Sequence, residues 1–150
     1  MGDRAVITTV GATDNDVGIY IHWDGDLEKV EAFLTYCKMK GFRSPETDCY
    51  GFSYLCTVLG NFFGNGLSVG VDTLNHLDKD NHDNGVYYIQ DWKIVARSYK
   101  DEPIETDKKH LFNYLKMIND CQSESIKVRV DEIKFYCSGN NIPVVEEEIA

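Results

Sequence analysis

Hydrophobic and polar residues alternate in two segments near the N-terminus and in two more near the middle of the chain. Residues 4–10 and 17–23 have the period of a strand, because successive side chains of a strand point to opposite faces. The residues between them are turn formers, so the two segments predict a β-hairpin. Residues 86–90 and 93–99 predict a second hairpin around a two-residue turn.

Helical spacing of apolar residues marks three further segments. These segments are residues 27–37, 48–63 and 111–121, in which apolar side chains recur every three or four positions. Two more segments, 67–74 and 126–136, alternate and are predicted to be strands.

The order of these elements contains hairpins rather than regular βαβ units. We therefore predict an α+β fold with a mainly antiparallel sheet built from two hairpins and about three helices packed on one face. Residues 1–150 are interpreted as a single domain, with residues 104–150 as an alternative C-terminal appendage after the Pro103 linker.

The helix predicted over 48–63 has the cleanest apolar stripe and is expected to be the most buried. Asp48 is its expected N-cap, since a carboxylate accepts the unpaired N–H groups of the first turn. Three side chains are expected to be nearly inaccessible: Phe52, Cys56 and Leu59.

Composition narrows the classes of partner. The net charge is −10 and the pI is near 4.7, which disfavours direct binding of nucleic acid or an anionic membrane. A basic protein partner or a divalent cation fits this charge better, although solubility alone accounts for it. The five cysteines form no C-x-x-C pair and no apolar leader is present, so a reduced cytoplasmic protein without cofactors is expected. Its oligomeric state is open, with a homo-oligomer among the alternatives.

Cys49 is the one residue with a recognisable catalytic context. The sequence Asp48-Cys49-Tyr50-Gly51-Phe52 resembles the Asp-Cys-x-Gly-Phe signature of NlpC-type cysteine endopeptidases. That resemblance implies a nucleophile at Cys49, but Asn84 stands where the family has its histidine. His82 is the alternative base, since a cysteine nucleophile needs one within hydrogen-bond reach. We favour instead a Cys49 thiol buried on the apolar stripe, where burial disfavours the thiolate.

The acidic loop before residue 85 offers weak candidates for a metal site. Three aspartates are its potential ligands: Asp78, Asp80 and Asp83. The spacing from Asp80 through His82 and Asn84 to Asp91 is similar to a calcium loop, but the residue types at several positions are poor substitutes. A solvated turn is the favoured interpretation, and the cysteines and histidines have no zinc spacing.

Aromatic and arginine residues supply the candidate binding surface. Exposed aromatics suit a protein interface or a pocket that stacks a base, and arginines suit its phosphates. The candidates are Arg4, Tyr20, His22, Trp23, Arg43, Tyr50, Tyr87, Trp92 and Arg97.

Two patches of sequence carry a wider resemblance. Residues 2–6 and 18–25 resemble the "GDRA … HW" opening of small uncharacterised proteins from bacteriophages and mobile elements of Gram-positive bacteria. Residues 48–51, 60–64 and 83–87 are similar to a subgroup of them.

The resemblance to phage proteins implies counter-defence by binding rather than by catalysis. The predicted function is therefore inhibition of a basic host defence nuclease or effector through an acidic, aromatic-rich surface. Two alternatives stay open. One is a pocket that sequesters a signalling nucleotide between aromatics and Arg4, Arg43 or Arg97, and the other is an NlpC-like cysteine hydrolase that uses Cys49.

Overall fold

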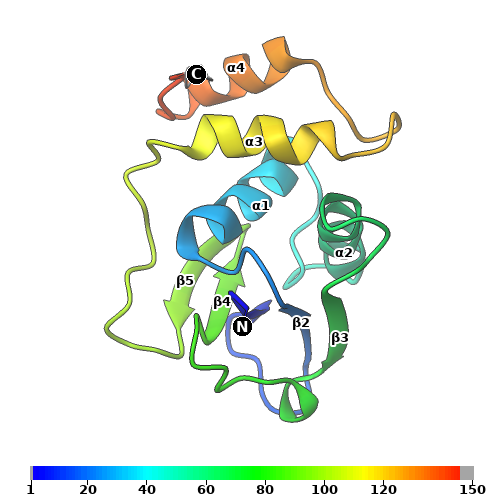
Figure 1. Cartoon of the computed structure of the whole chain (residues 1–150), viewed down its shortest axis with the longest axis vertical. Helices are drawn as coiled ribbons and strands as arrows, with labels where there is room; N and C mark the ends of the chain where they lie inside the picture. The colour runs from blue at the N-terminus through cyan, green and yellow to red at the C-terminus, as the bar shows by residue number, and fades with distance from the viewer. Residues whose placement is uncertain (1, 146–150) are drawn as a thin grey trace.

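The computed structural model describes residues 2–145, which form a five-stranded mixed sheet with helices on one face (Figure 1). The strand order is β3-β2-β1-β4-β5; β1 and β4 run parallel, and the other neighbouring pairs are antiparallel. The strands are β1 (Ala5–Thr9), β2 (Val17–Ile21), β3 (Val69–Thr73), β4 (Val86–Gln90) and β5 (Lys93–Arg97). The α+β class and both predicted hairpins are confirmed.

Residues 2–145 contain four α-helices, where about three were predicted. They are α1 (Leu27–Met39), α2 (Tyr50–Phe62), α3 (Leu111–Asp120) and α4 (Val130–Gly139). In Figure 1, α1 and α2 lie nearest the sheet, α3 packs on α1, and α4 packs on α3 as the outermost layer. A short 3₁₀ helix, η1 (Leu74–His76), follows β3. Within residues 2–145, every helix is too short or too polar to span a membrane.

The prediction of a strand over 126–136 was wrong, because this segment enters helix α4 at Val130. The residues before the helix are extended, and Val128 exchanges two hydrogen bonds with the Asn119 side chain at 2.9 and 2.8 Å. Ile133 and Cys137, four residues apart, form the buried side of the helix. The alternation of Ile126, Val128 and Val130 therefore described only the approach to the helix.

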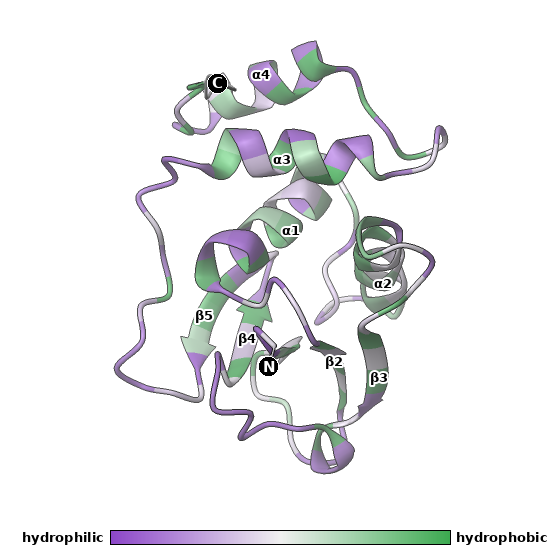
Figure 2. Cartoon of the chain, viewed as in Figure 1, coloured by the Kyte–Doolittle hydropathy of each residue, from purple (hydrophilic) through white to green (hydrophobic). Residues whose placement is uncertain are grey.

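The two faces of the sheet have different environments. Ile7 of β1 and Tyr87 of β4 point to the helices and are fully buried in the main core. Val6 and Tyr88, one position away on the same strands, belong to a smaller cluster under η1. Tyr87 and Tyr88 therefore lie on opposite faces of the sheet. Figure 2 shows the mostly hydrophilic loops that join β3 to β4 and β5 to α3.

Helix α2 is less buried than predicted. Helix α1 lies between the sheet and α3 and buries six side chains, whereas α2 has an open outer side. Leu59 is buried as predicted, but Phe52 and Cys56 are only half-buried. The helix begins at Tyr50, so its N-cap is Cys49 and not Asp48 as predicted. Asp48 still accepts a hydrogen bond from the Tyr50 N–H at 2.8 Å.

Candidate functional site

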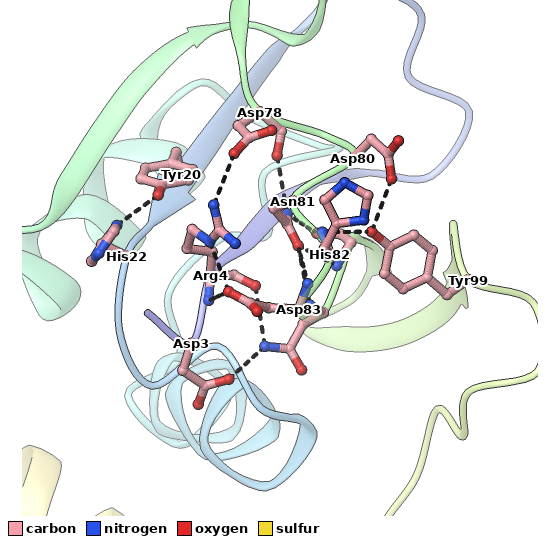
Figure 3. Close-up of polar contacts among 12 residues, drawn as sticks. Asp3, Arg4, Tyr20, His22, Asp78, Asp80, Asn81, His82, Asp83 and Tyr99 are labelled. Carbon is pink, nitrogen blue, oxygen red and sulfur yellow. Dashed lines mark hydrogen bonds and ion pairs between the residues drawn. The ribbon is translucent and has the colours of Figure 1, made fainter. Parts of the chain in front are cut away.

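The N-terminal segment 2–5 lies between two loops that are distant in sequence (Figure 3). The Asp3 N–H donates to the His22 carbonyl at 2.9 Å, and the Gly25 N–H donates to the Asp3 carbonyl at 2.8 Å. On its other side, the Asn84 N–H donates to the Arg4 carbonyl at 3.1 Å. The motif residues of the N-terminus, of the β2–α1 loop and of the loop before β4 therefore form one cluster.

Arg4 is the charged centre of this cluster. Its Nε lies 2.7 Å from Asp83 Oδ2, and its backbone N–H donates to the same oxygen at 3.0 Å. A second carboxylate, Asp78, lies 3.6 Å from its guanidinium. The Arg4 guanidinium holds the pKa of Asp83 below its usual range. Because two carboxylates already surround Arg4, it is not an open anion ligand.

Asn81 organises the loop before β4 and was missed as a site residue. It is 1% exposed, and its side-chain oxygen accepts the N–H groups of Asp83, Asn84 and Gly85 at 2.9–3.1 Å. Its amide donates to the carbonyls of Asp78 and Gly85. An asparagine two residues before Asp83-Asn84-Gly85 is a recognised turn signal, so the sequence contained this information.

The weak metal candidates have other partners. Asp78 and Asp83 face Arg4, whose guanidinium takes the place between them that a cation would need. Asp80 accepts a hydrogen bond from the Tyr99 hydroxyl at 3.2 Å. Across residues 2–145, no three His, Cys, Asp or Glu side chains are grouped so that they could hold a metal ion.

Tyr20, His22 and Trp23 form an aromatic group beside Arg4. The Tyr20 hydroxyl lies 2.8 Å from His22 Nδ1, and the Trp23 ring meets the His22 ring edge-on at 5.0 Å between centroids. Burial raises the pKa of Tyr20. Trp23 is 47% exposed, so this group has one open aromatic face.

Tyr87, Trp92 and Arg97 lie in the interior and serve the fold. The Arg97 guanidinium stacks on the Tyr87 ring at 4.5 Å and donates to the carbonyls of Pro103 and Asn84. The Trp92 indole N–H donates to the Phe42 carbonyl at 2.8 Å. The predicted pocket of Arg4, Arg43 and Arg97 is thus not assembled, because each guanidinium has its own surroundings.

Arg43 and Tyr50 are brought together at the start of α2, in a stack of four side chains. The Arg43 guanidinium lies 4.5 Å from the centre of the Tyr50 ring. Tyr50 is followed by Tyr54 at 6.2 Å, and Tyr54 by Phe42 at 4.3 Å with an angle of 15° between the rings. Tyr54 could have been found from sequence, since residues four apart are neighbours on a helix; Phe42 carried no such signal. Asp48 lies 3.3 Å from Arg43 and orients it.

The segment 42–50 that carries this stack is fixed to the body of the protein. A side chain at Gly51 would meet Pro45 Cα at 2.6 Å, so α2 packs directly on the backbone of the segment. The Asp91 N–H of the β4–β5 turn donates to the Glu46 carboxylate at 3.1 Å, next to the Trp92–Phe42 bond. The stack is therefore held in place before any partner arrives.

Cys49 is exposed, which corrects the prediction that it is buried. The buried side of α2 is formed by Gly51, Leu55, Val58 and Leu59, so it is rotated by about one residue from the predicted stripe. Cys49 belongs to the segment 42–50, which contacts the C-terminal end of β4 through Glu46. His82 instead precedes the N-terminal end of that strand. A strand rises about 3.3 Å per residue, so the structure does not bring His82 to Cys49.

The stack at the start of α2 offers aromatic and guanidinium groups for contact with another molecule. Its four side chains include no group that could act as a base for Cys49. Comparisons with known proteins add no identity to it: no protein-family model matches the chain, and neither do the curated proteins or the solved structures.

Proposed function

We propose that this chain is a non-catalytic binding protein whose stack of Phe42, Tyr54, Tyr50 and Arg43 contacts a protein partner. The observation that carries the proposal is the exposure of a fixed aromatic–guanidinium stack, in which Tyr50 is 53% exposed although it lies between Tyr54 and Arg43. Tyrosine and arginine, with tryptophan, are the residue types most enriched among side chains that dominate binding energy. A pre-ordered stack also loses little conformational entropy on binding.

The counter-defence role rests on the resemblance to phage and mobile-element proteins and on the charge of the chain. A net charge of −10 favours approach to a basic surface, such as the nucleic-acid groove of a host nuclease or effector. Arg43 would sit within that acidic background as a specific contact, because Asp48 already balances its charge. The partner is therefore proposed to be a basic host protein that the chain blocks by occupancy.

A comparison of three immobilised variants tests this proposal. Wild type, Tyr50→Ala and Leu67→Ala are exposed to lysate from the infected host, and the bound proteins are identified and then purified. Leu67 is a matched control, since it is 69% exposed and lies outside the stack. We expect the partner to bind wild type and Leu67→Ala, and Tyr50→Ala to bind at least about tenfold more weakly. The purified partner should be a nucleic-acid enzyme whose activity falls when wild type is added.

If Tyr50→Ala and wild type bound the partner with equal affinity, the stack would not be part of the interface. Undiminished activity of the purified partner would contradict the inhibitor role while leaving the binding surface intact.

A second candidate function uses a cavity rather than the stack. A cavity of about 590 Å³ lies between α1, β5 and the end of α4, and its lining includes Trp92, Tyr136, Lys38, Lys93 and Lys108. Its volume is in the range of small-molecule sites, and lysines can pair with phosphates. Lys38 and Lys108 are paired within the lining with Asp91 and Glu31, at 2.7 and 3.8 Å. A nucleotide phosphate would therefore be held here mainly by Lys93, in place of the three arginines suggested by the sequence.

Calorimetry with cyclic oligonucleotides and ADP-ribose separates the two candidates. Heat of binding that is lost in Lys93→Glu and kept in Tyr50→Ala would favour nucleotide sequestration over the protein inhibitor. Absence of heat with every nucleotide would leave the stack as the binding site.

A further inference from the structure

Helix α4 is the outermost layer of the molecule, and it carries an exposed hydrophobic side chain on the side that faces away from the core. It packs on α3 (Figure 1). The side chains that it buries fully are Ile133 and Cys137. Phe135 points the opposite way and is 83% exposed, more than any other large hydrophobic side chain within residues 2–145. A position on the far side of the helix from the core gives Phe135 no role in folding.

A groove runs beside Phe135 between α4 and the end of α1. It has a volume of about 600 Å³, and its apolar lining comes from Met39, Val128, Tyr136 and Phe135 itself. Its charged lining is two cations and two carboxylates: Lys40, Arg129, Asp131 and Glu132. The lining of the groove is therefore neutral in a chain whose net charge is −10.

The exposed Phe135 ring and the groove beside it lie on one face, so two copies of this face can fit together, with the ring of each in the groove of the other. Phe135 lies near the middle of α4, which runs from Val130 to Gly139. If two copies of α4 meet antiparallel about an axis beside Phe135, each ring lies over the groove of the other copy. In such a two-fold interface the same patch serves both subunits.

The charges along α4 favour this antiparallel arrangement over a parallel one. Its first turn carries Asp131 and Glu132, whereas its last turn carries Ser138 and Gly139. Antiparallel pairing places each pair of carboxylates opposite a hydroxyl and a glycine, where a carboxylate can accept a hydrogen bond and the backbones can approach. Parallel pairing would place carboxylates opposite carboxylates, which is destabilising.

We propose that the outer face of α4 binds a second copy of this chain, with Phe135 of each copy in the groove of the other. A second copy is favoured over an acidic or basic partner because the lining of the groove is neutral and the face is complementary to itself. Elsewhere the excess of carboxylates repels another copy, so association should strengthen as salt screens the net charge. This surface is separate from the stack on α2 and does not depend on its function.

Sedimentation velocity over a range of protein concentrations tests the proposal. We expect wild type to self-associate, and Phe135→Glu to weaken the association at least about tenfold, since it places a carboxylate in the apolar groove. Leu67→Glu is the control, because Leu67 is also exposed but lies next to β3. It should associate like wild type, and circular dichroism should show both variants folded.

Ser138→Lys tests the orientation of the two helices. In the antiparallel arrangement, the new ammonium faces Glu132 of the other copy and should tighten the association several-fold. In a parallel arrangement it would face the same ammonium of the other copy, and the repulsion would weaken the association. A monomer at every concentration, an association unaffected by Phe135→Glu, or a weaker one in Ser138→Lys would each overturn the proposal.

Discussion

At the scale of single residues, Gly51 explains why the segment 42–50 keeps its conformation. Replacement of a helical glycine by alanine normally stabilises a helix by up to about 1 kcal/mol. At Gly51 the added methyl group would lie 2.6 Å from Pro45 Cα, and backbone atoms cannot move aside cheaply. We therefore expect Gly51→Ala to lower the free energy of unfolding by about 2 kcal/mol. Urea denaturation measures this change.

Gly60→Ala is a matched control within the same helix. The nearest atom to an added methyl group there is Gly66 Cα at 3.5 Å, which is an ordinary contact. This variant should be as stable as wild type or more so. Equal effects of the two substitutions would mean that Gly51 is not held against Pro45.

Exposure of Cys49 leads to a prediction opposite to that for a buried thiol. Cys49→Ala should change the free energy of unfolding by no more than about 0.5 kcal/mol, because an exposed side chain loses few contacts. Under native conditions, iodoacetamide should modify Cys49 and Cys121, which are exposed. Cys37 and Cys137 should be protected by burial, which also raises the pKa of Cys137 to about 11. Mass spectrometry of the modified peptides checks this order.

At the scale of elements, the sequence predicted what short-range patterns control. Both hairpins were found because alternation and turn residues agree locally, and the Asp91-Trp92 turn carries the positive φ angles that tight hairpin turns need. The parallel pairing of β1 with β4 joins residues about 80 positions apart, and no local pattern encodes it. The same limit applies to the candidate site, where the contact of Arg4 with Asp83 depends on that pairing.

Two errors had local causes. Helix α4 was taken for a strand because its extended approach has the alternation of one, although that approach is held by the Asn119 side chain, nine residues before Val128. The buried side of α2 was misplaced by about one residue, since Gly51 has no side chain and gave no hydrophobic signal. The stack of Arg43 on Tyr50 joins a loop to a helix start and likewise could not be predicted.

Asn119 connects three elements and should be a sensitive position. It is 3% exposed, accepts a hydrogen bond from the Tyr36 hydroxyl of α1 at 2.7 Å, and exchanges two with Val128. Asn119→Ala leaves these buried groups without partners, at a cost of about 2–3 kcal/mol. Tyr36→Phe removes a single one of the bonds and should cost about 1 kcal/mol.

Hydrogen exchange distinguishes this role of Asn119 from general loss of stability. Faster exchange should be concentrated at residues 128–139, because the approach to α4 is what Asn119 holds. A uniform increase along the chain would contradict a local role.

At the scale of the whole molecule, the N-terminal cluster makes stability depend on pH in two opposing ways. The Arg4 ion pair lowers the pKa of Asp83 from 3.8, so its contribution is present above that value and is lost as pH falls through the lowered pKa. Burial and the neighbouring Asp26 carboxylate raise the pKa of Asp3. The contribution of Asp3 is therefore complete below 3.8 and is lost as pH rises through the raised pKa.

Two isosteric variants separate these contributions. Asp83→Asn should be less stable than wild type at neutral pH, and the difference should shrink as the pH is lowered below 3.8. Asp3→Asn keeps an oxygen that can accept the Asn84 hydrogen bond but removes the repulsion from Asp26. Its melting temperature should therefore rise relative to that of wild type as the pH rises. Thermal melting of the three proteins from acid to neutral pH measures both trends. Parallel pH profiles for all three proteins would show that the cluster around Arg4 does not control the acid stability of the fold.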